Sequence, residues 1–427
     1  RFWDSRAHRK PYPRREEQKH WILNIFKKDR KLISVVDSLN LIGQTMDSIL
    51  DFLAQDEELS QDFQKYLEIN EIEIETPKQF NNFVIEYILD MKMQSGLRVL
   101  EYFRRNNKSY DEIINALLNS FVSIFKVNKI LSNGFETTCI TSEKDVTLIP
   151  MVKMNHLKQI GRYDYIEARI VELNGAYFIL EVHDVISEHD VFKATTEGIK
   201  HLIQDSRCAY FKNEEKRKIL EKSAEEFYEK MKECFGLEED CNFITTTNKK
   251  VDELIKYFNE FRLDGKKKDY SNLIEKVEKN RFLEIKELNS SESDFLENAI
   301  GGFSSHKETY DVALWVDKKR GFYVIPFFET FLKCFKEEIE GKEACIREFL
   351  TSDKIPPSVI KYALEENENF FEEVNKVLNT DFSTLEELLF NTKSAFIENG
   401  IFSPTTVLFN SELFSNLLEI TKGDNSF

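Results

Sequence analysis

The spacing of apolar residues divides the chain into helical and β-rich regions. Over residues 16–120 apolar positions recur every three or four residues, for example at Phe80 and Val84. That spacing puts them on one face of a helix. Thr76-Pro77 predicts a helix start, because threonine caps helix N-termini and proline fits the first turn. This region is therefore predicted to be all-helical.

The spacing changes at about residue 121. Short β-branched runs follow one another up to residue 186, separated by turn residues. Asn174-Gly175 is the strongest hairpin signal, because both central positions of a type I′ turn need positive φ. Residues 121–186 are therefore predicted to form a small antiparallel sheet or barrel of about five strands.

Helical spacing returns after residue 187 and is interrupted once. Gly236 is placed to end one helix, and Asn248 is placed to cap the next. Ser109 with Glu112, and Ser383 with Glu386, have the spacing of capping boxes.

A second hairpin is predicted near residues 310–326. Tyr310-Asp311 opens it, as Tyr163-Asp164 opens the first, and each pair is followed about eleven residues later by a glycine, Gly321 or Gly175. The distance to the glycine differs by one residue, which indicates similar architecture rather than a repeat.

These patterns predict an α+β fold that is predominantly helical, with a small antiparallel β-sheet or barrel module and a second, embedded hairpin. Only 14 glycines and 8 prolines occur, which excludes collagen-like and turn-dense all-β chains. The predicted parts are a basic arm (1–15), a helical domain (16–120), the β module (121–186), a helical region (187–300) and a hairpin with helices (301–427).

Positive charge is concentrated at the N-terminus. The formal net charge is −17, yet residues 1–31 contain 11 Lys and Arg against 4 Asp and Glu, a net charge of +7 that leaves −24 on the rest. Arginines contact phosphates and aromatic rings stack on bases, so the arm is a candidate nucleic-acid interface; a solvated terminal extension or a linker is the alternative explanation. The candidate residues are Arg1, Trp3, Arg6, Arg9, Lys10, Arg14 and Arg15.

The remaining composition argues for an intracellular protein. Six cysteines in 427 residues are too few for a disulfide framework and predict reduced, half-buried thiols. No apolar run approaches the length of a membrane helix, and no signal-peptide core follows the charged N-terminus. We therefore expect a cytoplasmic location and no membrane contact.

One group of residues has the chemistry of a metal site. Glu181 and His183 are two residues apart on a predicted strand, so they project from the same face, and Asp164 lies on the strand expected to pair with it. Carboxylates and imidazoles bind divalent metals. An ordinary solvated sheet face explains the same residues, and the nuclease pattern would have lysine where His183 stands.

Other catalytic patterns are absent. The sequence contains no phosphate-binding glycine loop and no nucleophile elbow. Gly301-Gly302, followed by Ser304, Ser305 and His306, is a candidate anion-binding turn or a structural turn.

The β module also carries a resemblance. Gly161 to Tyr165, Ala168 to Ile170 and Gly175 to Phe178 resemble a stretch in SEC-C-motif-associated bacterial proteins, over about residues 121–180. The cysteine-rich zinc motif that defines that family is absent from this chain. The resemblance implies protein or nucleic-acid contacts and gives no catalytic residue.

Together these observations favour a binding or adaptor protein rather than an enzyme, without a cofactor. The basic arm is the expected contact for nucleic acid or a protein partner. Two alternatives stay open: a nuclease-like, metal-dependent hydrolase using Asp164, Glu181 and His183, and a structural subunit of an assembly.

Overall fold

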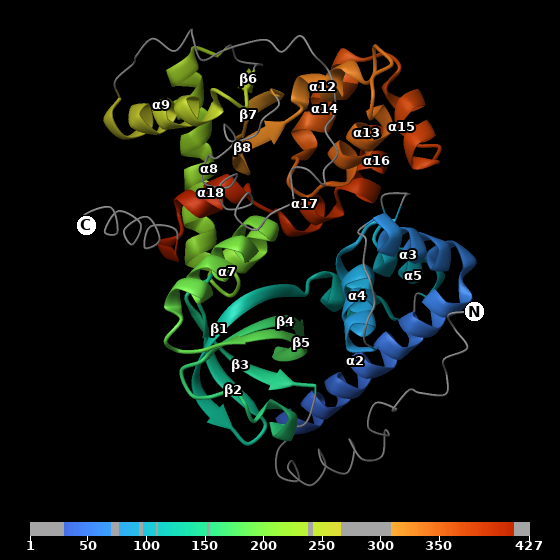
Figure 1. The fold of residues 1–427 in the computed structure, drawn as a ribbon, viewed down its shortest axis with the longest axis vertical. Helices are drawn as coiled ribbons and strands as arrows, with labels where there is room; N and C mark the ends of the chain where they lie inside the picture. Colours follow the sequence, from blue (N-terminus) through green and yellow to red (C-terminus); the bar gives the residue numbers. More distant parts are fainter. Residues whose placement is uncertain are drawn as a thin grey trace. The chain divides into compact units, whose positions relative to one another are not determined.

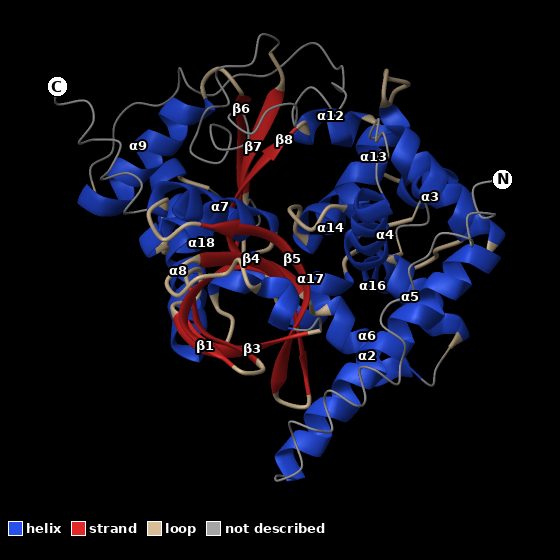
Figure 2. Cartoon of the chain, turned by 60° about the horizontal axis from the view of Figure 1, so that its bottom comes forward, coloured by secondary structure: helices blue, strands red, loops and turns tan. Residues whose placement is uncertain are grey.

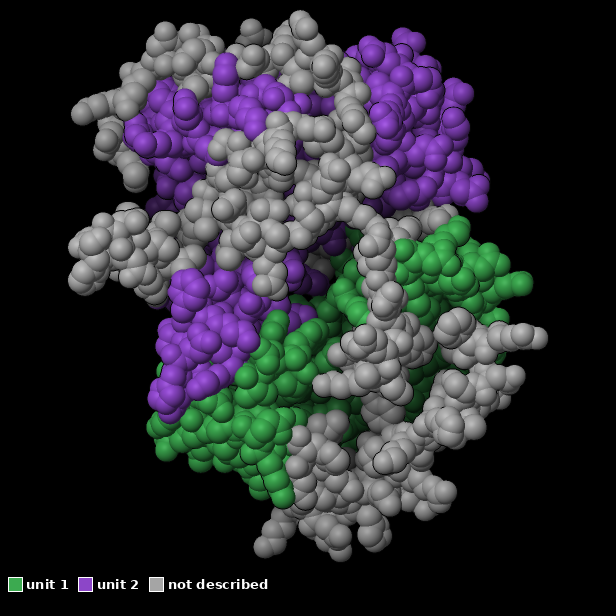
Figure 3. Space-filling model, in the orientation of Figure 1, with its two compact units in different colours: residues 1–121, 125–138, 145–185 green, residues 122–124, 139–144, 186–427 purple. Residues whose placement is uncertain are grey.

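The computed structural model describes residues 30–69, 77–93, 97–107, 110–151, 154–237, 242–265 and 309–413 (Figure 1). The fold is α+β, as predicted. It divides into two compact units that interleave along the chain (Figure 3). Unit 1 contains residues 1–121, 125–138 and 145–185, and unit 2 contains residues 122–124, 139–144 and 186–427.

The helices of unit 1 pack against the barrel that follows them in sequence. Ile49 and Leu117 belong to one apolar cluster with Val171, Leu173 and Phe178 of the β module. Residues 16–120 and 121–186 were expected as separate domains, and this shared core joins them in one unit. The helices are α2 (Arg30–Gln55), α3 (Glu57–Ile69), α4 (Pro77–Asp90), α5 (Val99–Asn106) and α6 (Asp111–Leu118).

The β module is a closed five-stranded barrel with strand order β1-β2-β3-β5-β4, drawn in red in Figure 2. β3 and β5 pair in parallel, with Leu148 opposite Tyr177, so the barrel is mixed. A short 3-10 helix, η3 (Met154–Leu157), lies between β3 and β4. The strands are β1 (Phe121–Leu131), β2 (Gly134–Cys139), β3 (Lys144–Pro150), β4 (Tyr165–Leu173) and β5 (Ala176–Ile186).

Two glycine positions explain the barrel's tight connections. Asn174 and Gly175 have φ values of 54° and 72° between β4 and β5, which confirms the predicted hairpin turn. At Gly134 a Cβ atom would overlap the Leu148 carbonyl oxygen, so only glycine allows β2 to approach β3 this closely.

Unit 2 is built around a three-stranded antiparallel sheet, β6-β7-β8. The predicted hairpin is β7–β8. The outer strand β6 was not predicted, and its pairing with β7 joins Phe243 to Trp315, more than seventy residues away. The elements are α7 (Val191–Gln204), η4 (Ser206–Ala209), α8 (Glu214–Phe235), β6 (Phe243–Thr247), α9 (Val251–Asp264), β7 (Asp311–Asp317), β8 (Gly321–Pro326), α12 (Phe328–Lys333), α13 (Lys342–Thr351), α14 (Pro357–Glu366), α15 (Phe370–Leu378), α16 (Leu385–Thr392), α17 (Ser394–Asn399) and α18 (Pro404–Phe409).

A single aromatic-rich core holds unit 2 together. It takes residues from both the 187–300 and the 301–427 range, including Phe227, Phe258 and Phe322. The rings of Phe227 and Phe322 stack 5.8 Å apart, and Phe258 lies 5.3 Å from Phe322. The two ranges therefore share one core and fold as one unit.

Several helix ends follow the sequence signals, and two do not. Gly236 ends α8 with φ at 64°, as predicted. Asn248 does not cap α9. Its Oδ1 accepts a hydrogen bond from the Tyr310 N–H at 3.1 Å and so fixes the start of the β7 segment. The cap of α16 is Thr384, which accepts from the Glu387 N–H at 3.2 Å, one residue beyond the predicted Ser383 and Glu386.

Across these ranges every helix falls short of the length or the apolar character that crossing a membrane requires.

Candidate nucleic-acid interface

The outer surface of the barrel over β1 carries a cluster of polar and charged side chains. Along β1, Phe125 and Val127 are fully buried, whereas Lys126 and Asn128 are partly exposed and Ile130 is 45 % exposed. This alternation is that of a strand with one face in the core. We call the surface around these outward residues the barrel patch: Lys126, Asn128, Lys129, Thr138, Asp145, Arg162 and Tyr163.

The loop before β4 adds an arginine and a tyrosine to this patch. Tyr163 is 42 % exposed, and the Arg162 guanidinium lies 4.6 Å from the centre of its ring. Arg162 Nε donates to the Asn128 carbonyl oxygen at 3.0 Å, which fixes the arginine against β1. The pair therefore presents a cation and an aromatic face side by side.

The backbone of this loop is held in an unusual conformation. Tyr163 has φ at 78°, a region that aromatic residues rarely adopt. Its N–H donates to the Val127 carbonyl at 2.8 Å, and the Asp164 carbonyl accepts from the Val127 N–H at 2.8 Å. The Gly161 N–H donates to Asp164 Oδ2 at 2.7 Å. These bonds impose the strain that keeps the Tyr163 ring at the surface.

Two cations of the patch are set apart from the carboxylates of the described residues. None of those residues places a carboxylate within ion-pair distance of Lys126 or Arg162. The Lys126 ammonium instead lies 5.8 Å from the ring centre of Tyr165. The third cation, Lys129, has its ammonium 3.6 Å from Glu136, with both side chains about half exposed. The patch thus has unbalanced positive charge within a strongly acidic chain.

The predicted metal site does not form. Asp164 binds the Gly161 N–H and so shapes the loop, while Glu181 and His183 approach each other, with His183 Nε2 3.7 Å from Glu181 Oε2. Within the described ranges no three His, Cys, Asp or Glu side chains are grouped closely enough to hold a metal ion. The spacing along the strand brings Glu181 and His183 onto one face, but the Asp164 carboxylate binds the Gly161 N–H in its own loop.

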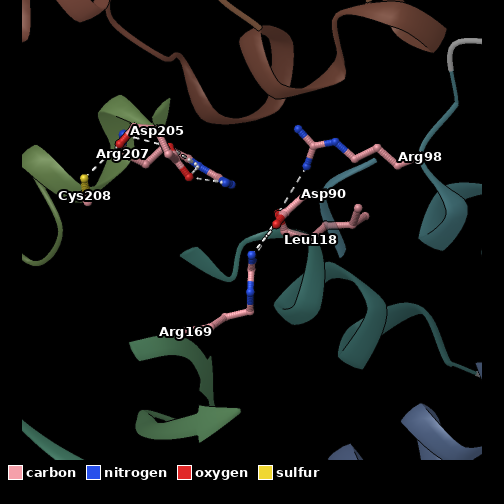
Figure 4. Close-up of polar contacts among 7 residues, drawn as sticks. All are labelled: Asp90, Arg98, Leu118, Arg169, Asp205, Arg207 and Cys208. Atoms are coloured by element: carbon pink, nitrogen blue, oxygen red, sulfur yellow. Dashed lines mark hydrogen bonds and ion pairs between the residues drawn. The ribbon is translucent and has the colours of Figure 1, made fainter. Parts of the chain in front are cut away.

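An ion pair between a buried arginine and an exposed aspartate elsewhere in unit 1 has a structural role. Arg169 on β4 is 4 % exposed and binds Asp90 at the end of α4 through both guanidinium nitrogens, with Nη1 3.0 Å from Oδ1 (Figure 4). Arg98, also buried, donates to the Leu118 carbonyl at 3.5 Å. Both arginines join helices to neighbouring backbone or strands, and neither presents its charge to solvent.

A second buried polar group lies in unit 2, at η4 (Figure 4). Arg207 Nε lies 2.8 Å from Asp205 Oδ1, and Cys208 Sγ donates to the Asp205 carbonyl at 2.9 Å. Burial raises the pKa of the Cys208 thiol, which keeps it protonated and unreactive. This cluster stabilises a turn.

Unit 2 also contains an open cavity of about 580 Å³ beside α13 and α15. Lys342 is its most buried cation, and its ammonium lies 3.0 Å from Glu338 and 3.1 Å from Glu373. Because the carboxylates balance this charge, the cavity shows no preference for an anion or a cation.

Other predicted site residues lie outside the described ranges. These are the arm residues Arg1, Trp3, Arg6, Arg9, Lys10, Arg14 and Arg15, and the Gly301-Gly302 turn with Ser304, Ser305 and His306. Five cysteines are described, and among them no disulfide forms; all five are buried, whereas half-buried thiols were predicted: Cys139, Cys208, Cys234, Cys334 and Cys345.

Comparison with protein-family models, with curated proteins and with solved structures finds no match for this chain. The resemblance to SEC-C-motif-associated proteins therefore stays a prediction.

Proposed function

We propose that this protein binds unpaired nucleic acid through the barrel patch and acts as a binding protein rather than an enzyme. The observation that carries the proposal is the pairing of uncompensated cations with an exposed, arginine-backed aromatic ring, at Lys126, Arg162 and Tyr163. Cations attract phosphates, and an exposed ring offers a base a stacking surface that a base-paired duplex cannot use.

The position of the patch on the barrel supports the same proposal. It lies over β1, β2 and the start of β3, whereas β4 and β5 contribute Val171, Leu173 and Phe178 to the core shared with the helices. The strand order β1-β2-β3-β5-β4, with parallel β3 and β5, is also that of the oligonucleotide- and oligosaccharide-binding fold, in which the β2–β3 face carries the ligand. A fold alone does not define function, because unrelated functions occupy the same folds. The proposal therefore depends on the side chains of this face rather than on the strand order.

The basic arm has a separate part in the proposal. Residues 1–31, which include the arm, have a net charge of +7 that adds affinity for any polyanion, without base recognition. The acidic remainder of the chain repels a polyanion, so we expect binding to be confined to the arm and the barrel patch.

The test measures binding of the full chain to labelled 20-nucleotide single strands by fluorescence anisotropy across a salt series. The variant Lys126→Glu/Arg162→Glu is expected to bind about tenfold or more weakly. For each phosphate that the variant no longer neutralises, the slope of log K against log salt should become shallower by about 0.7. A duplex of the same length should bind more weakly than the single strand.

The control is a double variant that changes the net charge by the same amount at positions outside the patch. Lys218 and Lys361 are exposed helix residues of unit 2, so Lys218→Glu/Lys361→Glu should change affinity far less. Deletion of residues 1–20 separates the arm from the patch. Equal losses in the two double variants, or no binding by the unaltered chain, would contradict the proposal.

A further inference from the structure

A chain of hydrogen bonds crosses three strands inside the barrel patch. Asn128 on β1 donates from Nδ2 to Thr138 Oγ1 on β2 at 2.8 Å, and Thr138 Oγ1 donates to Asp145 Oδ1 on β3 at 2.5 Å. The Asn128 carbonyl oxygen of the backbone accepts from Arg162 in the same patch. The chain of hydrogen bonds therefore adjoins the cation and aromatic pair described above.

The direction of these bonds follows from the chemistry of their ends. A carboxylate only accepts, so the single hydroxyl proton of Thr138 goes to Asp145. The Thr138 oxygen must then accept from Asn128, which assigns the nitrogen of the amide to that bond and leaves its oxygen on the other side. No described residue donates to Asn128 Oδ1 or to Asp145 Oδ2.

The patch consequently offers hydrogen-bond acceptors next to its cations. Asp145 is exposed, and Asn128 is partly exposed. Bases differ in what they present to such acceptors. Cytosine and adenine carry an exocyclic amino group that donates, whereas thymine and uracil have a carbonyl oxygen at the corresponding position. A carbonyl oxygen facing a carboxylate is repelled rather than bound.

We infer that the Asn128–Thr138–Asp145 chain selects bases with an amino group at position 4 of a pyrimidine or position 6 of a purine, so that the barrel patch prefers cytosine and adenine over thymine and uracil. This inference rests on the proposed function. Phosphates contact Lys126 and Arg162, one base stacks on Tyr163, and a neighbouring base donates its amino hydrogen to Asp145. Thr138 holds the carboxylate in place and acts as a positioning residue.

The test compares oligo(dC) with oligo(dT) of 15 nucleotides, because these pyrimidines match in size and differ at the amino or carbonyl group. Both are titrated against the full chain at pH 7.5 and constant salt by fluorescence anisotropy, with oligo(dA) as a third ligand. We expect oligo(dC) and oligo(dA) to bind about five- to tenfold more tightly than oligo(dT), within the range of a single base contact.

The substitution Asp145→Asn separates recognition from charge. Loss of a negative charge raises affinity for every strand, so the readout is the dC/dT affinity ratio. That ratio should fall to about one, because an amide can donate to the thymine carbonyl. Glu136→Gln is the matched control: it removes another half-exposed carboxylate from β2 and should leave the ratio unchanged.

The outcomes are distinct from those that test the proposed function. Equal binding of all three strands, a preference for oligo(dT), or a ratio that survives Asp145→Asn would overturn the inference and leave nucleic-acid binding intact. Absence of binding to every strand would remove the proposed function itself. Thr138→Val, which keeps side-chain shape and removes the hydroxyl, should lower the ratio without abolishing binding.

Discussion

The two hairpins, β4–β5 in unit 1 and β7–β8 in unit 2, begin with the same Tyr-Asp pair and use it in opposite ways. Tyr163 is 42 % exposed on the barrel surface, whereas Tyr310 is 3 % exposed and stacks on Phe327 with ring centres 4.6 Å apart. The difference arises from what lies beside each tyrosine, an exposed loop in one case and a phenylalanine-rich core in the other. Similar sequence signals thus specify a hairpin in both places but do not specify its surroundings.

The aspartates that follow these two tyrosines, Asp164 and Asp311, also differ in what they bind. Asp164 accepts the Gly161 N–H of its own loop. Asp311 is 2 % exposed and caps the start of α12, accepting from the Glu329 N–H at 2.5 Å and the Thr330 hydroxyl at 2.6 Å. One hairpin therefore builds a candidate binding surface, and the other anchors a core. Three pairs of substitutions test that contrast.

The largest effect is expected at the tyrosines. Tyr310→Ala should lower the free energy of unfolding by about 4 kcal/mol, because it empties a large buried volume. Tyr163→Gly should leave stability unchanged or raise it by up to about 1 kcal/mol, because glycine relieves the strain of positive φ. Urea unfolding followed by circular dichroism measures both.

The two tyrosine variants, Tyr310→Ala and Tyr163→Gly, should also separate effects on stability from effects on binding. Tyr163→Gly is expected to weaken binding to single strands despite its intact stability, since the stacking surface is removed. A Tyr163→Gly protein that is strongly destabilised, or one that binds as tightly as the parent chain, would remove the contrast between the hairpins.

The next largest effect is expected at the turn glycines. Gly321 has φ at 98°, and a Cβ there would overlap the Thr406 hydroxyl that accepts the Phe322 N–H. Gly321→Ala should cost about 3 kcal/mol through strain and overpacking. Gly175 also has positive φ, but its surroundings are open, so Gly175→Ala should cost about 1 kcal/mol. Similar shifts of the urea midpoint for the two variants would show that backbone strain alone decides the cost.

The smallest of the three effects is expected at the aspartates. Asp311→Ala should cost about 2 kcal/mol, because the Thr330 hydroxyl and two N–H groups lose their acceptor in the core. Asp164→Ala should cost about 1 kcal/mol. Asp311→Asn is the conservative control, since its carbonyl oxygen still accepts.

Comparison of the parent chain with Asp311→Asn also tests how stability depends on pH. Burial raises the pKa of Asp311 in the folded protein, although the Thr330 hydroxyl opposes this. The folded state then binds the proton more tightly than the unfolded state. The contribution of Asp311 to stability should therefore fall as pH rises from its unfolded pKa through its folded pKa, and Asp311→Asn should remove that fall. Parallel pH–stability curves for the two proteins would contradict this assignment.

Local signals in the sequence account for most of the elements. Asn174-Gly175 and Gly236 need positive φ whatever surrounds them, so their positions could be read directly. The one-residue difference between the hairpins comes from the first strand of each: β4 has nine residues and β7 has seven. The turns partly offset this difference, since two residues follow β4 and three follow β7, where Asp317 accepts from the Lys319 N–H at 3.0 Å.

Long-range pairing could not be predicted in the same way. β6 has five residues, three of them threonine, and becomes a strand because Ile244 pairs with Leu314 far along the chain. Asn248 carries the residue type of a helix cap but serves the Tyr310 backbone instead. Such roles depend on tertiary contacts that no local pattern encodes.

The candidate site was only partly visible in the sequence. Arg162 and Tyr163 stand next to Asp164, which the sequence offered only as a candidate metal ligand, and their own role appeared only when the loop was placed against Asn128 and Val127. Barrel closure brings together residues from positions 126 to 163 that share no motif. The one sequence signal for this site was a basic residue, Arg162, beside an aromatic residue, Tyr163, just before a predicted strand.

The interleaving of the two units limits where the polypeptide chain can be divided into separate domains. Unit 2 includes residues 139–144, which precede most of unit 1's barrel strands. From that short stretch the Ser142 carbonyl accepts from Asn213 Nδ2 at 2.8 Å, and the Thr141 hydroxyl donates to the Cys208 carbonyl at 3.0 Å. A split at residue 186 would give a C-terminal half without these partners. We therefore expect that the two units cannot be exchanged separately between proteins and that they are inherited together.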